Sequence, residues 1–253
     1  MAGGTGFWHA LTSAEQTELA ECGRMAQFPA GSTMCVEGEP ATHLFILTSG
    51  WVKVSVVTRD GHELVLALRG NGEVVGELAD EADGYRTATM RAIVPVRALL
   101  VPHRAFSSYL EAFPAAGRAY TKAITDRWGK AAALLRTRAT ATGAQQLAGL
   151  LVDLASRHGV ARGRSVEIEM PLSQQELASL AGISRATLAR ALADWRGRGL
   201  VRSSRRHITI TDLDGLCALV AMLPTCSAGS SGVVPARRPG ERRRAGTSQH
   251  PVT

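Results

Sequence analysis

LSQQELASLAGISRATLARALADWRGRGL, residues 172–200, predicts two helices joined by a tight turn. Ser173 and Glu176 form an S-x-x-E capping box, so the first helix should begin at Gln174. Apolar residues recur along it with helical spacing, and the small side chain of Ala178 lets a second helix approach closely.

The turn and the second helix follow directly. Gly182 ends the first helix, because a turn between crossing helices favours a residue that accepts positive φ. Ser184 can cap a helix that runs from Arg185 to about Arg198. A 3-4-3 spacing gives this helix one buried stripe. The stripe consists of Leu188, Ala191, Leu192 and Trp195.

The opposite face of the second helix is polar and small. It carries Arg185, Ala186, Ala189 and Arg190. An arginine near the start of a recognition helix is placed to meet base edges in the major groove. An ordinary helical hairpin would share the capping box and the turn glycine. The further combination of a small contact residue, a second cap and exposed arginines favours a DNA-binding helix-turn-helix.

Segments on both sides of this motif fit a winged domain. The expected elements are a helix over Ala144–His158, a loop over Gly159–Arg164, a strand over Val166–Met170, hairpin strands over Leu200–Arg202 and His207–Thr211 with a tip at Ser203–Arg206, and a short helix over Leu213–Leu223. Arg205 and Arg206 at the tip are placed to reach phosphates or the minor groove.

Between Phe28 and Val101 the hydrophobic period changes to two. Glycines separate the short runs, and Asp60-Gly61 is a strong hairpin signal. Regular short strands of this kind predict an antiparallel barrel, sandwich or roll, which can enclose a cavity for a small ligand. The expected strands are Thr33–Val36, Leu44–Thr48, Trp51–Val57, Glu63–Leu68, Thr87–Ile93 and Val96–Val101.

The stretch VGELADEADGYRTATMRA, which begins at Val75, gathers residues suited to an anionic ligand. Gly76 allows backbone N–H groups to approach an anion, and Arg86 supplies a permanent charge with fork geometry for a phosphate. Glu77 can accept hydrogen bonds from sugar hydroxyls, and Thr87 adds a hydroxyl donor. A surface turn with a Glu77–Arg86 salt bridge fits the same spacing, so both interpretations stay open.

Helical segments flank and interrupt the strands. Phe7–Cys22 should be a short helix capped by Thr12 or Ser13, Ala79–Tyr85 a short helix or turn, Pro102–Ala112 a helix, and Thr140–Gly143 a flexible hinge. The first helix should bury Leu11, Leu19 and Ala20.

A long helix is expected from Ala115 to about Thr140, which at 1.5 Å per residue is ~37 Å. Its apolar stripe is narrow, as in a two-helix seam, so the helix needs a partner. That partner is either its own strands or a second copy of the chain. The stripe consists of Tyr120, Ile124, Arg127 or Trp128, Ala131, Leu134 or Leu135, and Arg138.

The segment from Val75 resembles the phosphate-binding cassette of cyclic-nucleotide-binding domains. Joined to the helix-turn-helix, it resembles the Crp–Fnr family of bacterial transcription regulators. The resemblance covers roughly residues 8–214 and includes EGEPATHLFILTSGWVKV at Glu37–Val54. It implies an α+β chain with an N-terminal cyclic-nucleotide-binding β-roll, jelly-roll-like in form, a long dimerisation helix and a C-terminal winged helix-turn-helix. The implied boundaries are 1–114, 115–142, 143–224 and a disordered basic tail at 225–253.

The resemblance also implies roles for individual residues. Glu77 would bind the ribose 2′-OH, Arg86 with Thr87 the cyclic phosphate, and Arg127 would lie close to the ligand. The implied effector residues are Gly76, Glu77, Leu78, Arg86, Thr87 and Arg127. The implied DNA-binding residues are Ser173, Gln174, Ser184, Arg185, Ala186, Thr187, Arg190, Arg205 and Arg206.

Two positions depart from the cyclic-AMP receptor pattern. Ala131 and Ala132 stand where cyclic-AMP receptor proteins have the two hydroxyl residues that contact adenine, which argues against adenine recognition by these side chains. Cyclic AMP is nevertheless the favoured effector on family frequency, with cyclic GMP or another phosphorylated ligand as the alternative. Ala186 replaces a glutamate in the recognition helix, and alanine offers only apolar contact, for example to a thymine methyl. Double-stranded DNA with a pseudo-palindromic operator, a second copy of the chain and RNA polymerase are the implied partners.

Composition agrees with a DNA-binding protein. The 253 residues are 45% hydrophobic and carry a net charge of +7, of which the five arginines and one glutamate of residues 225–253 contribute +4. This tail, rich in Ser, Gly, Pro and Arg, should be disordered, and it either adds salt-sensitive DNA affinity or has no function. No apolar run reaches a membrane span and no signal peptide is evident, so a cytoplasmic protein is expected.

Other functions fit the residues less well. No Ser/His/Asp set, metal-ligand cluster or nucleotide loop indicates an enzyme, and the four cysteines lack metal-site spacing. An iron–sulfur sensor is disfavoured by that spacing, and a haem sensor lacks a clear axial pair. A ligand-independent, architectural DNA-binding protein with a vestigial pocket remains the alternative.

Overall fold

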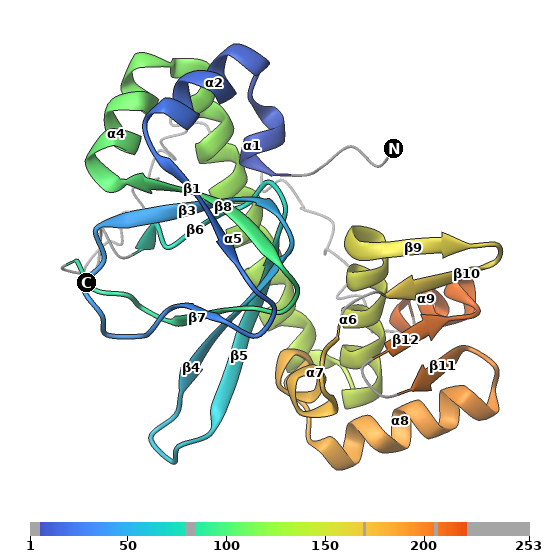
Figure 1. Cartoon of the computed structure of the whole chain (residues 1–253). Helices are drawn as coiled ribbons and strands as arrows, with labels where there is room; N and C mark the ends of the chain where they lie inside the picture. Colours follow the sequence, from blue (N-terminus) through green and yellow to red (C-terminus); the bar gives the residue numbers. More distant parts are fainter. Residues whose placement is uncertain (1–5, 79–83, 169–170, 205–206, 222–253) are drawn as a thin grey trace, which may run out of the picture. The chain divides into compact units, whose positions relative to one another are not determined.

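The computed structural model describes residues 6–78, 84–168, 171–204 and 207–221 (Figure 1). The first part is a roll of two four-stranded antiparallel sheets, with strand orders β1-β8-β3-β6 and β2-β7-β4-β5. Its strands are β1 (Arg24–Phe28), β2 (Thr33–Cys35), β3 (His43–Ser49), β4 (Trp51–Val57), β5 (Glu63–Gly70), β6 (Val74–Val75), β7 (Thr89–Ala92) and β8 (Val96–Pro102). The antiparallel roll expected from the glycine spacing is therefore confirmed.

Two strands of the roll were not predicted from the sequence. The first, β1, has mixed burial without strict alternation, and it forms because its five residues pair with β8 from Arg24↔Leu100 to Phe28↔Val96. The second, β6, has only two residues and pairs with Phe45 and Ile46 of β3. Both are defined by their partners rather than by a local pattern.

The N-terminal helix is divided in two. Helix α1 (Phe7–Ala10) ends at Leu11, whose extended backbone breaks the helix, and α2 (Ser13–Glu21) begins after it. Of the two candidate caps, Thr12 is the N-cap and forms a capping box with Glu15. Leu11 and Leu19 are buried as expected, but Ala20 is exposed, so that prediction was wrong.

Aromatic and aliphatic side chains form two hydrophobic clusters in the N-terminal part. One cluster joins the N-terminal helices to α4 (His103–Ala112) and α5 (Pro114–Thr140), where the rings of Phe7, Phe106 and Tyr120 meet edge to face. A second cluster lies between the sheets and includes Phe45 and Val75. The second cluster supports the cassette, because Val75 directly precedes Gly76.

The break after α5 is short. Helix α6 (Gly143–His158) is capped by Thr142 through a capping box with Gln145, so only Ala141 and Thr142 separate the two helices. Gly143 has a packing role that the sequence did not reveal. A Cβ there would lie 2.7 Å from the Thr187 Cγ2 atom, so glycine lets α6 begin against the helix-turn-helix.

The C-terminal part is the expected winged helix-turn-helix. Its elements are β9 (Gly159–Arg162), β10 (Ser165–Ile168), α7 (Gln174–Ala181), α8 (Arg185–Gly197), β11 (Val201–Ser204), β12 (His207–Ile210) and α9 (Leu213–Ala221). The four strands form one antiparallel sheet in the order β11-β12-β10-β9. The loop expected at 159–164 was wrong, because residues 159–162 pair with β10 as a strand.

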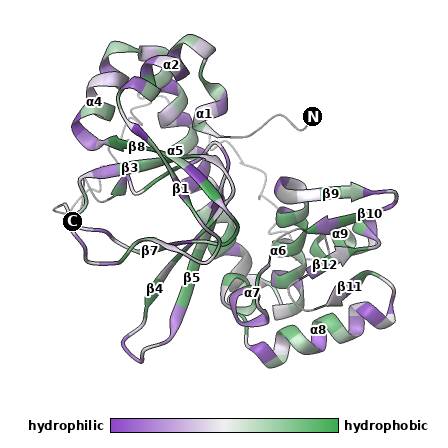
Figure 2. Ribbon diagram, in the orientation of Figure 1, coloured by the Kyte–Doolittle hydropathy of each residue, from purple (hydrophilic) through white to green (hydrophobic). Residues whose placement is uncertain are grey.

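Helix α8 buries the predicted stripe. Leu188, Leu192 and Trp195 are each at most 3% exposed and share one core with α6 and α7. Hydrophobic and hydrophilic residues accordingly alternate along α8 in Figure 2. Gly182 adopts φ +70°, as the turn requires. Among the described residues, no helix is both long enough and apolar enough to cross a membrane.

Candidate functional site

Arg86 lies at the centre of the cassette. It is only 4% exposed, and its guanidinium carbon lies 5.0 Å from the centre of the Phe45 ring, a cation–π contact. Its Nη1 atom donates to the Gly76 carbonyl oxygen at 3.5 Å. Burial lowers the pKa of Arg86, yet a guanidinium stays charged at neutral pH. The roll therefore holds a fixed, mostly buried positive charge.

Within the described part of the chain, no carboxylate pairs with this guanidinium. The alternative of a Glu77–Arg86 salt bridge is therefore wrong. A buried charge is costly unless an opposite charge and hydrogen bonds compensate it. The arrangement suits an anion that enters from outside the chain.

Gly76 is required by the close approach of Arg86. Its φ is +84°, and a Cβ built there would lie 2.6 Å from the Arg86 Nη1 atom. A side chain at this position would strain the backbone and displace the guanidinium. The glycine expected to open the backbone toward an anion thus also makes room for the arginine.

The backbone of Arg86 is fixed by a segment that the sequence analysis did not connect with it. The Arg86 N–H donates to the Glu39 carbonyl at 2.8 Å, and the Gly38 N–H donates to the Arg86 carbonyl at 2.8 Å. One step away, the Ala41 N–H donates to the Gly84 carbonyl at 2.7 Å. The EGEPA run at residues 37–41 was visible in the sequence, but the run itself does not reveal that the segment around Arg86 is its partner.

Glu77 is held by the long helix. Its Oε1 atom accepts from Arg127 Nη2 at 2.6 Å, and Arg127 Nη1 donates to the Val74 carbonyl at 3.2 Å. The Glu77 and Arg127 side chains are 10% and 23% exposed. The structure thus brings Glu77 and Arg127 together, and it leaves the second carboxylate oxygen, Oε2, to serve a hydroxyl donor.

The other predicted effector residues lie nearer the surface. Thr87 is exposed beside Arg86, and Leu78 is 54% exposed. Residues 79–83 of the expected helix or turn lie outside the described residues. Burial and the charge of Arg86 lower the pKa of His43 to about 4, so this nearby imidazole is neutral at pH 7. No group of His, Cys, Asp or Glu side chains among the described residues is arranged to hold a metal ion.

Most of the predicted DNA-binding residues of the helix-turn-helix are exposed. The exposed residues are Gln174, Ser184, Arg185, Ala186 and Arg190, with Ser173 and Thr187 half-buried at the helix starts. Ser184 caps α8, because its Oγ atom accepts from the Thr187 N–H at 3.0 Å. Figure 1 shows α8 with the α7–α8 turn at its start, where Arg185 is the first helical residue.

The wing is only partly described. Arg205 and Arg206 lie outside the described residues. Arg202 on β11 is exposed, and the sequence analysis did not include it. Beside the wing tip, Glu167 Oε1 contacts His207 Nε2 at 2.9 Å. This hydrogen bond and the one from Arg162 lower the pKa of Glu167.

Comparison with known proteins supports both the roll and the helix-turn-helix part of the chain. Residues 25–113 match the family described as "Cyclic nucleotide-binding domain", and residues 145–219 match "Crp-like helix-turn-helix domain". A "CRP-like cAMP-activated global transcriptional regulator" of Mycobacterium tuberculosis is 32% identical over 189 residues, which is 75% of this chain and 84% of the relative. A "Global nitrogen regulator" of Synechococcus elongatus is 27% identical, over 74% of this chain and 85% of the relative.

Solved structures share the fold. A mutant of CooA from Carboxydothermus hydrogenoformans superposes with a TM-score of 0.69 at 21% identity, covering 85% of this chain and 96% of that one. The regulator CLP of Xanthomonas campestris, titled as c-di-GMP responsive, has a TM-score of 0.68 at 21% identity, covering 79% and 99% of the two chains. At this identity the likeness establishes the fold alone.

The close contact between Gly76 and the Arg86 guanidinium can be tested by measuring the free energy of unfolding. We expect Gly76→Ala to lower the free energy of unfolding by more than Gly61→Ala, measured by denaturant titration. Both glycines have positive φ, +84° and +76°, so each alanine strains the backbone by roughly 1–2 kcal/mol. Only at Gly76 must a buried guanidinium also move, which adds about 1–3 kcal/mol of overpacking. Equal losses in the two variants would contradict the close contact.

Proposed function

The chain belongs to the Crp–Fnr family of transcription regulators, and we propose that it is a homodimeric, sequence-specific DNA-binding regulator controlled by a cyclic nucleotide bound in its roll. The observation that carries this proposal is the buried guanidinium of Arg86, which no described carboxylate neutralises, on the same chain as an exposed recognition helix. Such a protein is a cytoplasmic regulator rather than an enzyme.

The cassette supports the sugar-phosphate half of the ligand. Arg86 offers fork geometry to a phosphate, and exposed Thr87 adds a hydroxyl donor beside it. Glu77 has one oxygen on Arg127, so its other oxygen can accept from a ribose hydroxyl. Arg127 thereby positions the glutamate, and through it the sugar, from the long helix.

The base half of the pocket is less specific. Ala131 and Ala132 on α5 are exposed and offer no side-chain hydrogen bond to a purine. Cyclic AMP remains the favoured effector, because the M. tuberculosis relative is named as cAMP-activated, and cyclic GMP is the second candidate. The same two alanines favour the alternative function, a constitutive or architectural DNA-binding protein with a vestigial pocket.

The second copy of the chain would dock on α5, on a stripe that shares only Trp128 and Leu135 with the one expected. Tyr120 packs on Phe7 and Phe106, and Arg127 binds Glu77, so that side of the helix faces its own roll. The exposed stripe repeats every three to four residues, as in a two-helix seam. It consists of Thr121, Thr125, Trp128, Ala132 and Leu135.

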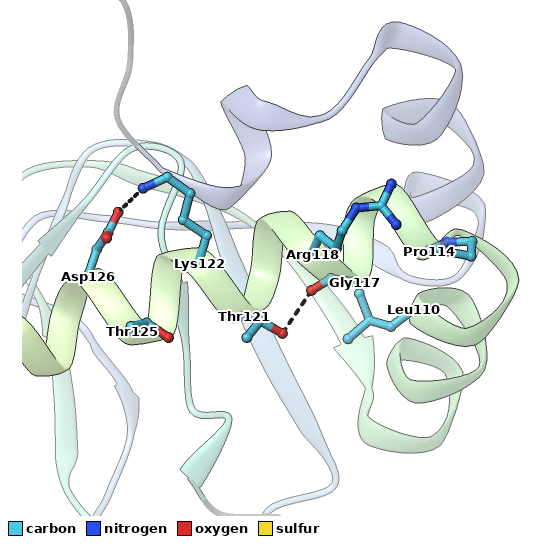
Figure 3. A pocket seen from close by; sticks show the side chains of 8 residues that line it. All are labelled: Leu110, Pro114, Gly117, Arg118, Thr121, Lys122, Thr125 and Asp126. Atoms are coloured by element: carbon cyan, nitrogen blue, oxygen red, sulfur yellow. Dashed lines mark hydrogen bonds and ion pairs between the residues drawn. The ribbon is translucent and has the colours of Figure 1, made fainter. Parts of the chain in front are cut away.

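The N-terminal part of this stripe borders a shallow groove. The groove has a volume of about 660 Å³ and lies between α5 and Leu110 of α4 (Figure 3). Thr121 and Thr125 line it, while Trp128 follows one turn later and is 70% exposed. A large aromatic side chain exposed in a monomer suits an interface, where tryptophan contributes strongly to binding.

The dimer can be tested at Trp128. We expect Trp128→Glu to convert a dimer into a monomer in sedimentation at micromolar concentration, because two like charges would meet across the seam. Lys130→Glu changes charge on the opposite side of the same helix and should leave the dimer intact. A wild-type protein that sediments as a monomer with and without cyclic AMP would refute the dimer itself.

The effector can be tested by calorimetry with cyclic AMP and cyclic GMP. We expect Arg86→Ala to lower affinity at least about 100-fold, since two charge-assisted hydrogen bonds are lost, each ~1.5–3 kcal/mol. Arg86→Lys should lose less, because it keeps the charge but not the fork. Tight operator binding without binding of either nucleotide at millimolar concentration would establish the constitutive alternative.

Sequence recognition can be tested at Arg185. In a binding-site selection, Arg185→Ala should lose preference at one base pair in each half-site, worth ~1–3 kcal/mol, because base contacts carry the discrimination. Arg198→Ala, at the other end of α8, should keep the wild-type preference. An unchanged preference in the Arg185 variant would mean that a different element reads the DNA.

A further inference from the structure

Lys53 is a charged residue buried outside the effector pocket. It lies on β4 and is 5% exposed, although lysine is rarely buried without a partner. Its Nζ atom donates to Glu63 Oε2 on β5 at 2.9 Å and to Glu176 Oε1 on α7 at 2.6 Å. One ammonium group of the roll thus binds the first helix of the helix-turn-helix.

A second polar contact joins the same two elements. The Val65 N–H on β5 donates to Ser179 Oγ on α7 at 2.8 Å. Val65 and Leu68 also belong to the hydrophobic core that includes Leu177 of α7. We refer to these interactions, Lys53–Glu176, Val65–Ser179 and their apolar surroundings, as the α7–β5 contact.

The α7–β5 contact uses a face of α7 that leaves the DNA-binding surface exposed. Glu176 and Ser179 are three residues apart and share one side of the helix. Gln174 on α7 and Arg185 and Arg190 on α8 remain exposed. A helix-turn-helix seated in this way is therefore accessible to DNA.

Glu176 serves both the helix and the contact. Its Oε2 atom accepts from the Ser173 N–H at 2.8 Å and completes the capping box, while Oε1 binds Lys53. Burial alone would lower the pKa of Lys53, but its hydrogen bonds to Glu176 and Glu63 outweigh this and raise the pKa. The ammonium is charged across the physiological range, so the Lys53–Glu176 ion pair does not depend on pH within that range.

We propose that Lys53 is a positioning residue that seats α7 on β4 and β5 and thereby holds the helix-turn-helix in an orientation ready for DNA. A domain that is already ordered loses less conformational entropy on binding than one that moves freely about its connection to α5. This inference rests on the proposed function only where DNA binding is the readout.

The position of Lys53 also explains how the roll could influence the DNA-binding part. Side chains alternate across a strand, so Val52 and Val54 face the core between the sheets while Lys53 faces α7. Val75, which precedes the cassette glycine, belongs to that same core. Strand β4 therefore has on one side the core that packs beneath the effector pocket and on the other side α7.

The test compares the full-length wild type with Lys53→Met, Glu176→Gln, their double variant and Ser179→Ala. Glu176→Gln keeps the capping box, since glutamine serves at that position, but removes the charge. Lys130→Met is the matched control, because Lys130 is an exposed lysine on the side of α5 opposite the proposed dimer stripe. Amide hydrogen exchange of the β5 peptide that contains Val65 and of the α7 peptide reports the contact directly, and operator affinity reports its effect.

We expect faster exchange in both peptides and operator affinity lower by about fivefold or more, the lower end of typical coupling between sites. The double variant should be no weaker than Lys53→Met, because both changes remove one interaction. Lys130→Met should match the wild type. If Lys53→Met does not fold, the Glu176 and Ser179 variants decide the question by the same readouts.

Two results would overturn the proposal. Unchanged exchange in the Glu176 and Ser179 variants would mean that the contact is absent in solution. Faster exchange with wild-type operator affinity would mean that the contact exists but does not position the DNA-binding part. If instead the wild type selects no DNA sequence, the proposed function and the positioning role both fail, whereas the exchange rates still report the contact.

Discussion

The burial of one guanidinium constrains much of the roll. Arg86 requires a glycine at Gly76 for space, an aromatic face at Phe45 and backbone partners at Gly38 and Glu39. These partners come from three separate segments, which only the closed pair of sheets can bring together. The roll thus maintains a positive charge away from bulk water, where its attraction to an anion is stronger than at the surface.

Helix α5 links the effector pocket to the rest of the chain, and two of its sides have different environments. One side packs on the roll through Ala116 and Tyr120, and Arg127 on the same side fixes Glu77. The adjacent side, around Trp128, is exposed and available to a second copy. Because one helix carries both surfaces, a ligand that moves Glu77 would also move the proposed dimer seam. Such a ligand can shift the protein between two states only by its difference in affinity for them.

The DNA-binding part depends on close packing of its helices against one another. Gly143 admits the Thr187 methyl group, and Gly182 adopts the left-handed conformation that turns α7 into α8. These two glycines let three helices bury Trp195 while Arg185 stays exposed. The core holds the recognition helix rigidly, and its exposed face is left free to specify sequence. This division agrees with a DNA-binding regulator.

The sequence by itself determined the features that depend on neighbours along the chain. The capping box at Ser173, the turn at Gly182 and the period-two strands all follow from local backbone chemistry, and the structure confirmed each of them. The types and spacing of the cassette residues within one short stretch indicated an anion site, but they left a surface Glu77–Arg86 salt bridge equally open. The structure bears out their proximity where it joins Gly76 to Arg86.

Only the tertiary structure decided which distant partner each side chain and strand would meet. Glu77 could have paired with Arg86 nearby, yet packing of α5 against the roll presents Arg127 instead. The same packing turns Tyr120 inward and leaves Trp128 exposed, a choice of helix face that a narrow apolar stripe does not specify. The burial of Lys53 likewise depends on a segment far along the chain, because its partner Glu176 lies on α7. Long-range partners are selected by the shape and burial of the assembled fold, and a linear pattern contains neither.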